Sequence, residues 1–352
     1  MVVRHLLRSR RTKGTLDAIT MSLDKEWPNF DAMPDEDALT QARPKGQKLA
    51  RWVWSDGELR DASDVHVHYY ANALHYGTAV FEGIRCYPSS RGPVLVRLRD
   101  HIERLLTSAR LYGLRVPYAA DALVRCAVEV TKRNGMQNGY LRPLVFYGMG
   151  PIDLKPKLEC SVHAFIAVRE LGTFLGEDAL RNGIRIMVSS WRKVHHSMLP
   201  TMAKASGHYA NNVLAAHEAL DHGFDDAILL NQDGTVACAT GHNVFFVKGG
   251  ELYTNDESSS IVPGITRDCV LDIAAEHGVR VVIRAFSRED LLRADEVFLT
   301  GTAAEVTPVR ELDGIQFKTG KKTLGALFQR AYLRAVTGKD ERRLGWLTPV
   351  NG

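Results

Sequence analysis

The chain has 352 residues and lacks any long hydrophobic run. Because a membrane-spanning helix needs about 20 consecutive apolar residues, we expect no membrane span. Cysteine is scarce, and no two cysteines form a Cys-x-x-Cys pair; they are Cys86, Cys126, Cys160, Cys238 and Cys269. A sparse, odd set of this kind excludes a disulfide framework and a structural zinc site. Reduced thiols and a cytoplasmic location are therefore expected.

The chain also lacks a surplus of charge outside its first 20 residues. The formal net charge is +4, and residues 1–20 carry five cationic side chains against Asp17 alone. The rest of the chain therefore has no net charge. Because a protein that binds nucleic acid needs a basic surface to neutralise phosphates, nucleic acid is excluded as a partner of the folded body.

Residues 1–46 differ in composition from the remainder and are expected to form a flexible N-terminal arm. The first 13 residues are basic without an acid, and residues 24–46 are rich in Pro, Asp, Lys and Gln. Two alternatives stay open for residues 1–20. They could be an organellar transit peptide, since such peptides are Arg-containing and poor in acids, or the chain could start at Met21.

From residue 50 onward, strand and helix patterns alternate. Residues 51–59 predict a hairpin at the Asp56-Gly57 turn. Asp100 and Glu103 predict a capping box at the start of a helix that closes at Gly113. Further strands are expected at 92–98, 140–147, 161–168, 184–190, 226–230, 244–247 and 252–253, and further helices at 121–134, 208–222 and 266–277.

This alternation predicts an α+β protein of two domains. The small domain is expected at residues 47–168, an interdomain loop at 169–177 and the large domain at 178–352. A ligand is expected in the cleft between the domains, a common position for binding sites. The histidines that could suggest a metal have no zinc-ligand spacing, so no metal site is predicted; they are His195, His196, His208 and His242.

Lys204 stands among small, neutral or apolar residues within residues 199–207. Two interpretations are open: a solvated surface lysine, which is the usual case, or an amine nucleophile in an apolar pocket. The expected start of a helix at Pro263-Gly264-Ile265-Thr266 offers free N–H groups to an anion, although Thr266 could instead cap the helix. Thr300-Gly301-Thr302 repeats this pattern of glycine and hydroxyl. Together these features indicate a phosphorylated aldehyde cofactor.

Five segments in order resemble one enzyme family. They are residues 75–85 (HYGTAVFEGIR), 140–143 (YLRP), 200–204 (PTMAK), 263–268 (PGITRD) and 301–308 (GTAAEVTP). The sequence resembles the branched-chain amino acid aminotransferases of class IV over about residues 47–350. These are fold-type IV enzymes that use pyridoxal 5′-phosphate (PLP). The resemblance implies that fold and a homodimer.

The resemblance also implies roles for individual residues. Lys204 matches the catalytic lysine that links to the cofactor aldehyde and moves the proton between substrate and cofactor. Tyr209 matches the partner of the cofactor phenolate oxygen. The phosphate would be held by Arg104, Ile265, Thr266 and Thr302.

The same comparison implies a substrate site. An apolar and aromatic pocket for the substrate side chain would be formed by Tyr76, Phe81, Tyr140 and Phe174. Arg85 and Arg142 lie where the family handles substrate carboxylates, and Arg142 would meet the second carboxylate of glutamate. Ala303 and Ala304 lie on the loop beside the substrate α-carboxylate.

One departure from the family lies in residues 236–243 (VACATGHN). The family places a glutamate five residues before the Asn, and its carboxylate keeps the pyridine nitrogen of PLP protonated. Here Cys238 stands at that position, and His242 replaces a second glutamate. A free thiol titrates at about pH 8.5 and is mostly neutral at pH 7. Losing one buried charge partner costs about 3–5 kcal/mol, which corresponds to roughly two to four decades in rate.

Three functions are therefore open. The first is an aminotransferase that acts on branched-chain or other apolar amino acids with 2-oxoglutarate or glutamate as the partner. The second is a PLP enzyme with non-transaminating chemistry, such as a lyase, a racemase or a specialised biosynthetic enzyme. The third is a non-catalytic homologue that binds a ligand.

Overall fold

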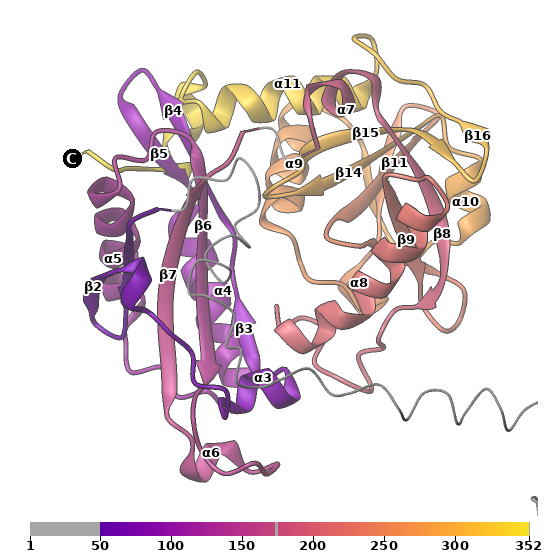
Figure 1. Ribbon diagram of the computed structural model, residues 1–352. Coiled ribbons are helices and arrows are strands. Elements are labelled where there is room, and N and C mark those ends of the chain that lie inside the picture. The colour runs from indigo at the N-terminus through magenta and orange to yellow at the C-terminus, as the bar shows by residue number, and fades with distance from the viewer. Residues whose placement is uncertain (1–49, 173–174, 352) are drawn as a thin grey trace, which may run out of the picture. The chain divides into compact units, whose positions relative to one another are not determined.

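Two β-sheets with helices packed against them organise the part of the chain that the structure describes (Figure 1). The structure, a computed structural model, describes residues 50–172 and 175–351. The arm expected at residues 1–46 and the pocket residue Phe174 lie outside these ranges. Within them, no helix is both long and apolar enough to cross a membrane.

The first sheet has eight strands in the order β17-β5-β4-β6-β7-β1-β2, with β3 paired to β6, and all of its pairs are antiparallel. Its strands are β1 (Trp52–Ser55), β2 (Glu58–Asp61), β3 (Ala79–Phe81), β4 (Ile84–Ser89), β5 (Gly92–Val96), β6 (Gly139–Tyr147), β7 (Val162–Glu170) and β17 (Leu347–Pro349). Its helices are α3 (Asn72–Tyr76), α4 (Leu98–Leu111), α5 (Ala120–Arg133) and α6 (Pro156–Glu159).

The predicted hairpin at residues 51–59 is confirmed. Trp54 pairs with Leu59 across β1 and β2, and the turn between them uses positive φ angles at Asp56 and Gly57. An Asp-Gly pair suits such a turn because both residue types tolerate positive φ better than most others.

The predicted capping box at Asp100 is wrong. Helix α4 begins at Leu98, and its N-cap is Arg97, in the left-handed conformation and without a side-chain cap. The Asp100 carboxylate instead accepts from the Arg97 guanidinium. The earlier start includes Leu98, which is buried in the core, and burial of such a side chain is worth about 1.5–3 kcal/mol. That gain exceeds the roughly 1 kcal/mol typical of an N-cap.

The second sheet has nine strands in the order β10-β9-β8-β15-β14-β11-β12-β13, with β16 paired to β15. Its strands are β8 (Ile184–Arg192), β9 (Asp226–Leu230), β10 (Val236–Ala239), β11 (Asn243–Lys248), β12 (Glu251–Thr254), β13 (Val281–Ile283), β14 (Glu296–Gly301), β15 (Glu305–Leu312) and β16 (Ile315–Gln316). Its helices are α7 (Glu177–Asn182), α8 (Ser206–Asp221), α9 (Ile265–Glu276), α10 (Arg288–Leu292) and α11 (Leu324–Val336).

The two sheets share a hydrophobic core, and Figure 1 shows α11 running across the top of both. The buried members of this shared core are Tyr87, Val94, Val96, Phe245, Val247, Leu252, Cys269, Val270, Ile273, Ala274, Phe298, Val306, Phe328, Tyr332 and Val336. The C-terminal strand β17 pairs with β5 of the first sheet. The predicted domain boundary at residues 169–177 stays a prediction, and strand pairing ties the end of the chain to the first sheet.

Candidate active site

A cavity of about 640 Å³, counted with its open mouth, lies where elements of both sheets meet. This size is within the range of about 300–1,000 Å³ that is usual for ligand pockets. The lining residues are Arg104, Lys193, Thr201, Ala203, Lys204, His208, Tyr209, Asn212, Cys238, Ala239, Gly241, His242, Asn243, Val262, Gly264, Ile265, Thr266, Thr300, Gly301 and Thr302. All seven side chains that the sequence assigned to a cofactor therefore line one cavity.

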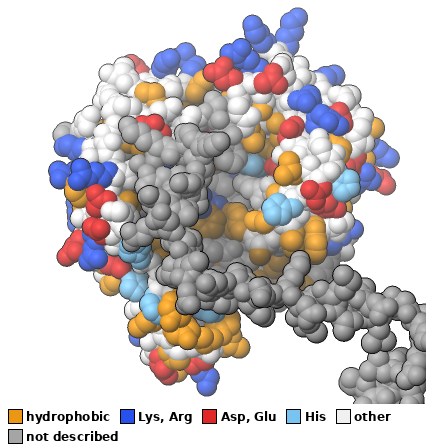
Figure 2. Space-filling model, in the orientation of Figure 1, with side chains coloured by type: hydrophobic (Ala, Val, Ile, Leu, Met, Phe, Trp, Pro, Cys, Tyr) orange, Lys and Arg blue, Asp and Glu red, His pale blue; other side chains and the backbone are white. Residues whose placement is uncertain are grey.

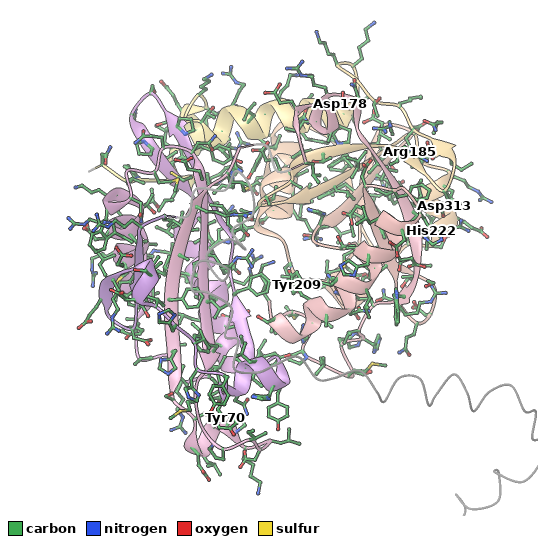
Figure 3. The ribbon with its side chains drawn as sticks, viewed as in Figure 1. Tyr70, Asp178, Arg185, Tyr209, His222 and Asp313 are labelled. Carbon is green, nitrogen blue, oxygen red and sulfur yellow. The ribbon has the colours of Figure 1, made fainter. Side chains whose placement is uncertain are left out.

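Lys204 and Tyr209 form a hydrogen-bonded pair in this cavity. The Lys204 Nζ donates to the Tyr209 hydroxyl at 2.7 Å and lies 5.1 Å from the centroid of the Phe81 ring. The backbone of Lys204 is fixed on both sides, because its N–H donates to Ser108 Oγ and its carbonyl accepts from the Phe81 N–H. Figure 3 shows Tyr209 on α8 near the first sheet, consistent with the 4.8 Å between its ring and that of Phe81.

Helix α9 presents its N-terminus to the cavity. Its N-cap is Gly264, which has no side chain to satisfy the first N–H groups, so the alternative that Thr266 caps the helix is wrong. Gly264, Ile265 and Thr266 all line the cavity. Unsatisfied N–H groups and the positive end of the helix dipole favour an anion at this point.

Arg104 adds a fixed cation to the same end of the cavity. Its Nε and Nη2 donate to the two oxygens of Glu82 at 2.6 and 2.9 Å, and its Nη1 donates to the Pro263 carbonyl at 2.7 Å. His101 contacts the same carboxylate at 2.7 Å. Burial alone would raise the pKa of Glu82, but Arg104 and His101 hold it well below its usual range. The ionised Glu82 thus orients Arg104 beside the start of α9.

The lining of the cavity also contains Lys193 and Cys238. Lys193 is 8% exposed, and its Nζ donates to Asn212 Oδ1 at 2.9 Å. Burial raises the pKa of the Cys238 thiol, although Lys193 and Lys204 act against this shift. Cys238 is therefore a neutral thiol at pH 7. His208 is also neutral there, because burial and Lys193 lower its pKa to about 4.

The ring of His242 contacts a buried carboxylate, that of Asp226, which does not line the cavity. Its Nδ1 lies 3.0 Å from Asp226 Oδ2, while Asp226 Oδ1 accepts from Thr240 Oγ1 and from the Ala227 N–H. Burial acts to raise the pKa of Asp226, but the hydrogen bonds from His242 and Thr240 outweigh burial and lower it. Asp226 is ionised but does not line the cavity.

A second cavity of about 900 Å³, again counted with its open mouth, adjoins the first. The two cavities share Lys204, Tyr209, Asn212, Gly241, His242 and Thr302. The other residues that line the second cavity are Phe81, Gly83, Tyr140, Arg142, Arg169, Val213, Ala216, Thr240 and Ala303. The guanidinium of Arg142 lies 4.6 Å from the Phe81 ring centroid and 5.3 Å from that of Tyr140. This cavity therefore combines apolar and aromatic surface with three cationic side chains, those of Arg142, Arg169 and Lys204.

Four predicted substrate residues line this second cavity, namely Phe81, Tyr140, Arg142 and Ala303. Three others line neither cavity. Tyr76 is 40% exposed on α3, Arg85 is buried 3.8 Å from Glu305, and Ala304 is buried behind its loop. The roles assigned to these three residues, and to Phe174, stay predictions.

The sequence did not single out Lys193 and Asn212 as site residues. A lone lysine after a strand looks like a surface charge, and nothing in its neighbours distinguishes it. Its burial comes from tertiary packing: the Lys193 N–H donates to the Leu230 carbonyl of β9, and α8 brings Asn212 to its ammonium group.

The residues present fit PLP at three of its four polar groups. Lys204 suits the aldehyde, Tyr209 suits the phenolate oxygen, and Arg104 with the start of α9 suits the phosphate. Thr300 Oγ1, a buried hydroxyl of the lining without a partner among the described residues, leaves a further donor for a ligand. The ring nitrogen is the exception, because no Asp or Glu lines the described cavity.

Comparison with known proteins agrees with this geometry. A sequence model of the class IV amino-transferase family matches residues 79–312. The branched-chain-amino-acid aminotransferase of Salmonella typhimurium is 43% identical over 305 residues, which are 86% of this chain and 99% of the relative.

Solved structures give the same result. The crystal structure of the Escherichia coli branched-chain amino acid aminotransferase is similar with a TM-score of 0.83 and 42% identity, covering 86% of this chain and 100% of that one. The branched-chain amino acid aminotransferase from Thermobaculum terrenum, solved in its PLP form, has a TM-score of 0.81 and 32% identity, covering 87% and 100%. The expected fold-type IV architecture is confirmed.

Proposed function

Because this chain belongs to the class IV amino-transferase family, we propose that it transfers the amino group of a branched-chain or other apolar amino acid to 2-oxoglutarate. The enzyme is a PLP-dependent transferase. The observation that carries the proposal is the position of Lys204, whose Nζ lies 2.7 Å from the Tyr209 hydroxyl at the junction of the two cavities. One cavity suits the cofactor and the other suits a substrate side chain.

PLP, when bound, supplies an aldehyde on an electron-withdrawing ring, and this chemistry is the cofactor's own. The protein supplies the groups that bind and orient. Arg104 and the N–H groups at the start of α9 neutralise the phosphate. Tyr209, which accepts from Lys204 Nζ at 2.7 Å, would donate its own hydroxyl hydrogen to the phenolate oxygen. The amine of Lys204 would move the proton at the substrate Cα.

The second cavity accounts for the use of two kinds of substrate. Phe81, Tyr140, Val213 and Ala216 give it apolar and aromatic surface for a branched side chain. Arg142 supplies a cation for the second carboxylate of glutamate or 2-oxoglutarate. Since Arg142 lies over two aromatic rings, its charge can remain partly shielded while an apolar substrate is bound.

The reaction is tested with purified protein, PLP, 2-oxoglutarate and L-leucine, L-isoleucine or L-valine, following glutamate and the branched oxo acid. We expect equal amounts of both products. Lys204→Ala should abolish turnover and alter the absorption band of the bound cofactor. Tyr209→Phe should retain the band and lower kcat about 10- to 100-fold, because it removes a hydrogen bond to a charged group worth about 1.5–3 kcal/mol.

The same assay separates the alternatives. Consumption of the amino acid without glutamate would indicate non-transaminating chemistry, and bound PLP without any turnover would indicate a ligand-binding homologue. The named relatives support the transaminase rather than either alternative. Tyr253→Phe is the matched control, because Tyr253 hydrogen-bonds Glu251 and lines neither cavity.

We further propose that the enzyme is a homodimer, on the basis of apolar side chains exposed around α3 and α6. A cytoplasmic location remains a prediction from the sequence.

A further inference from the structure

The described lining of the cofactor cavity contains three cations and no carboxylate. The cations are Arg104, Lys193 and Lys204. The two buried carboxylates nearby have other partners: both oxygens of Glu82 are bound by Arg104 and His101, and both oxygens of Asp226 have partners in Thr240 and His242. Neither carboxylate lines the cavity to receive a proton from a ligand.

The geometry of the cofactor decides which wall meets its ring nitrogen. In pyridoxal 5′-phosphate this nitrogen lies para to the carbon that bears the aldehyde. With the aldehyde at Lys204 and the phosphate at α9, the nitrogen would face the remaining polar wall of the cavity. That wall contains Lys193, which directly follows β8, and Cys238 of β10; these two strands lie on either side of β9.

Lys193 has a fixed position in this wall, and its ammonium group has N–H donors without a partner among the described residues. Its backbone N–H donates to the Leu230 carbonyl at 2.9 Å, and its Nζ donates to Asn212 Oδ1 at 2.9 Å. Asn212 is fixed in turn by the Thr240 carbonyl at 2.5 Å. An ammonium group has three N–H donors and no acceptor. Since one donor meets Asn212 and no other described residue accepts from it, two donors remain for a ligand.

We propose that Lys193 donates a hydrogen bond to the ring nitrogen of bound PLP, and that this nitrogen stays unprotonated. The inference rests on PLP binding as proposed above. An ammonium group can pair only with the lone pair of an unprotonated nitrogen. A pyridinium would add a further buried cation beside Lys193 without a carboxylate to compensate it, and like charges at such range disfavour the charged form. Cys238 lies in the same wall, and its neutral thiol provides no negative charge to balance a pyridinium.

The proposal changes what the ring contributes to catalysis. An unprotonated ring withdraws electrons less strongly than a pyridinium, so the carbanion at the substrate Cα gains less from the cofactor. This deepens the transaminase proposal, because it identifies Lys193 as a residue that contacts the cofactor and sets its charge.

The experiment measures the protonation of the ring directly. Holoenzyme is prepared with PLP that carries a heavy nitrogen isotope in the ring, and nuclear magnetic resonance records the shift of that nitrogen at pH 7. We expect the shift of an unprotonated, hydrogen-bonded pyridine. Lys193→Met should move it toward that of a pyridine without a donor, whereas Lys193→Arg should leave it hydrogen-bonded. Lys318→Met, at a lysine that is 72% exposed, should change nothing.

A double variant tests the charge of the wall. Lys193→Met with Cys238→Glu replaces the cation by a carboxylate, and we expect the ring nitrogen to become protonated. A pyridinium shift in the unaltered holoenzyme would overturn the inference while leaving PLP binding intact, as would a Lys193→Met shift identical to that of the unaltered protein. Failure of the unaltered protein to retain PLP through dialysis would instead defeat the proposed function itself.

Discussion

At the scale of one residue, the buried carboxylate of Glu82 orients Arg104 in the site. It has no exposed surface, yet it stays ionised because Arg104 and His101 contact its two oxygens. A buried pair of this kind contributes little net stability in itself, but removing one partner leaves an uncompensated charge. The function of Glu82 is therefore to fix the direction of Arg104, and its loss should be visible in stability.

We expect Glu82→Gln to lower the free energy of unfolding at pH 7 by about 3–5 kcal/mol, as is typical when one member of a buried ion pair is removed. The pKa of Glu82 is lowered on folding, so its contribution is fully present above the unfolded pKa of about 4.3. It is lost as the pH falls below this value toward the folded pKa. Urea unfolding of both proteins between pH 7 and pH 3 measures the difference.

The matched control is Glu289→Gln, because Glu289 is 80% exposed and its ion-pair partner in the described part of the chain is an exposed arginine. This variant should leave stability unchanged, since surface ion pairs contribute about 0–1 kcal/mol. A Glu82→Gln difference that grew as the pH fell would contradict the assignment of an ionised carboxylate.

At the scale of one element, the start of α9 depends on a glycine for steric reasons. Gly264 has an ordinary φ of −76°, so its conformation would suit any residue. A Cβ there would lie 2.0 Å from Asn243 Oδ1. Asn243 in turn donates to the Val262 carbonyl at 3.1 Å. Any side chain at position 264 must therefore displace the residues that set the first turn of the helix.

We expect Gly264→Ala to weaken PLP binding about tenfold or more, equivalent to about 1.4 kcal/mol, because the N–H groups at the start of α9 would shift away from the phosphate. Titration of the PLP-free protein, followed by the absorption of the cofactor, measures the dissociation constant. Gly345→Ala is the control, since its Cβ would meet no atom within 4 Å. Equal affinities for the two variants would show that α9 does not hold the phosphate.

The elements also show what the sequence could and could not reveal. Apolar periodicity and a terminal glycine placed α9 within one residue of its observed bounds, because a helix that buries one face must repeat its contacts. The start of α4 was missed, because burial of Leu98 outweighed the capping pattern at Asp100. Local preference sets an element only where tertiary packing does not compete with it.

The same limit applied to the site. Lys204, Arg104 and Tyr209 line one cavity, as the family resemblance predicted, although Arg104 is about 100 residues before the other two in the sequence. Lys193 had no such signal, because its importance lies in its burial against β9 and α8, which local composition does not encode. A buried lysine without a carboxylate partner is visible only in the folded chain.

At the scale of the whole molecule, large apolar side chains gather at the lower end of the first sheet, around α3 and α6 (Figure 2). Six of them are more than half exposed: Tyr69, Leu74, Met149, Ile152, Leu154 and Leu158. The two segments that carry them are held together, since Ala71 pairs with Met149 and Asn72 Nδ2 donates to the Asp153 carbonyl at 3.1 Å. A patch of this kind on a folded surface usually marks a protein interface.

We expect this apolar patch to form the contact between two copies of the chain. Leu154 and Leu158 are the most exposed of its side chains, at 80% and 76%, so the double substitution to aspartate should leave the monomer folded. In a dimer the same substitution would bury carboxylates without partners, at a cost of several kcal/mol for each charge, and should convert the protein to monomers. Sedimentation velocity at micromolar concentration measures the change.

The control is Leu220→Asp, at a leucine that is 71% exposed on α8, and this variant should remain dimeric. If Leu220→Asp dissociated the protein and the double variant did not, the interface would lie on the second sheet's side of the molecule.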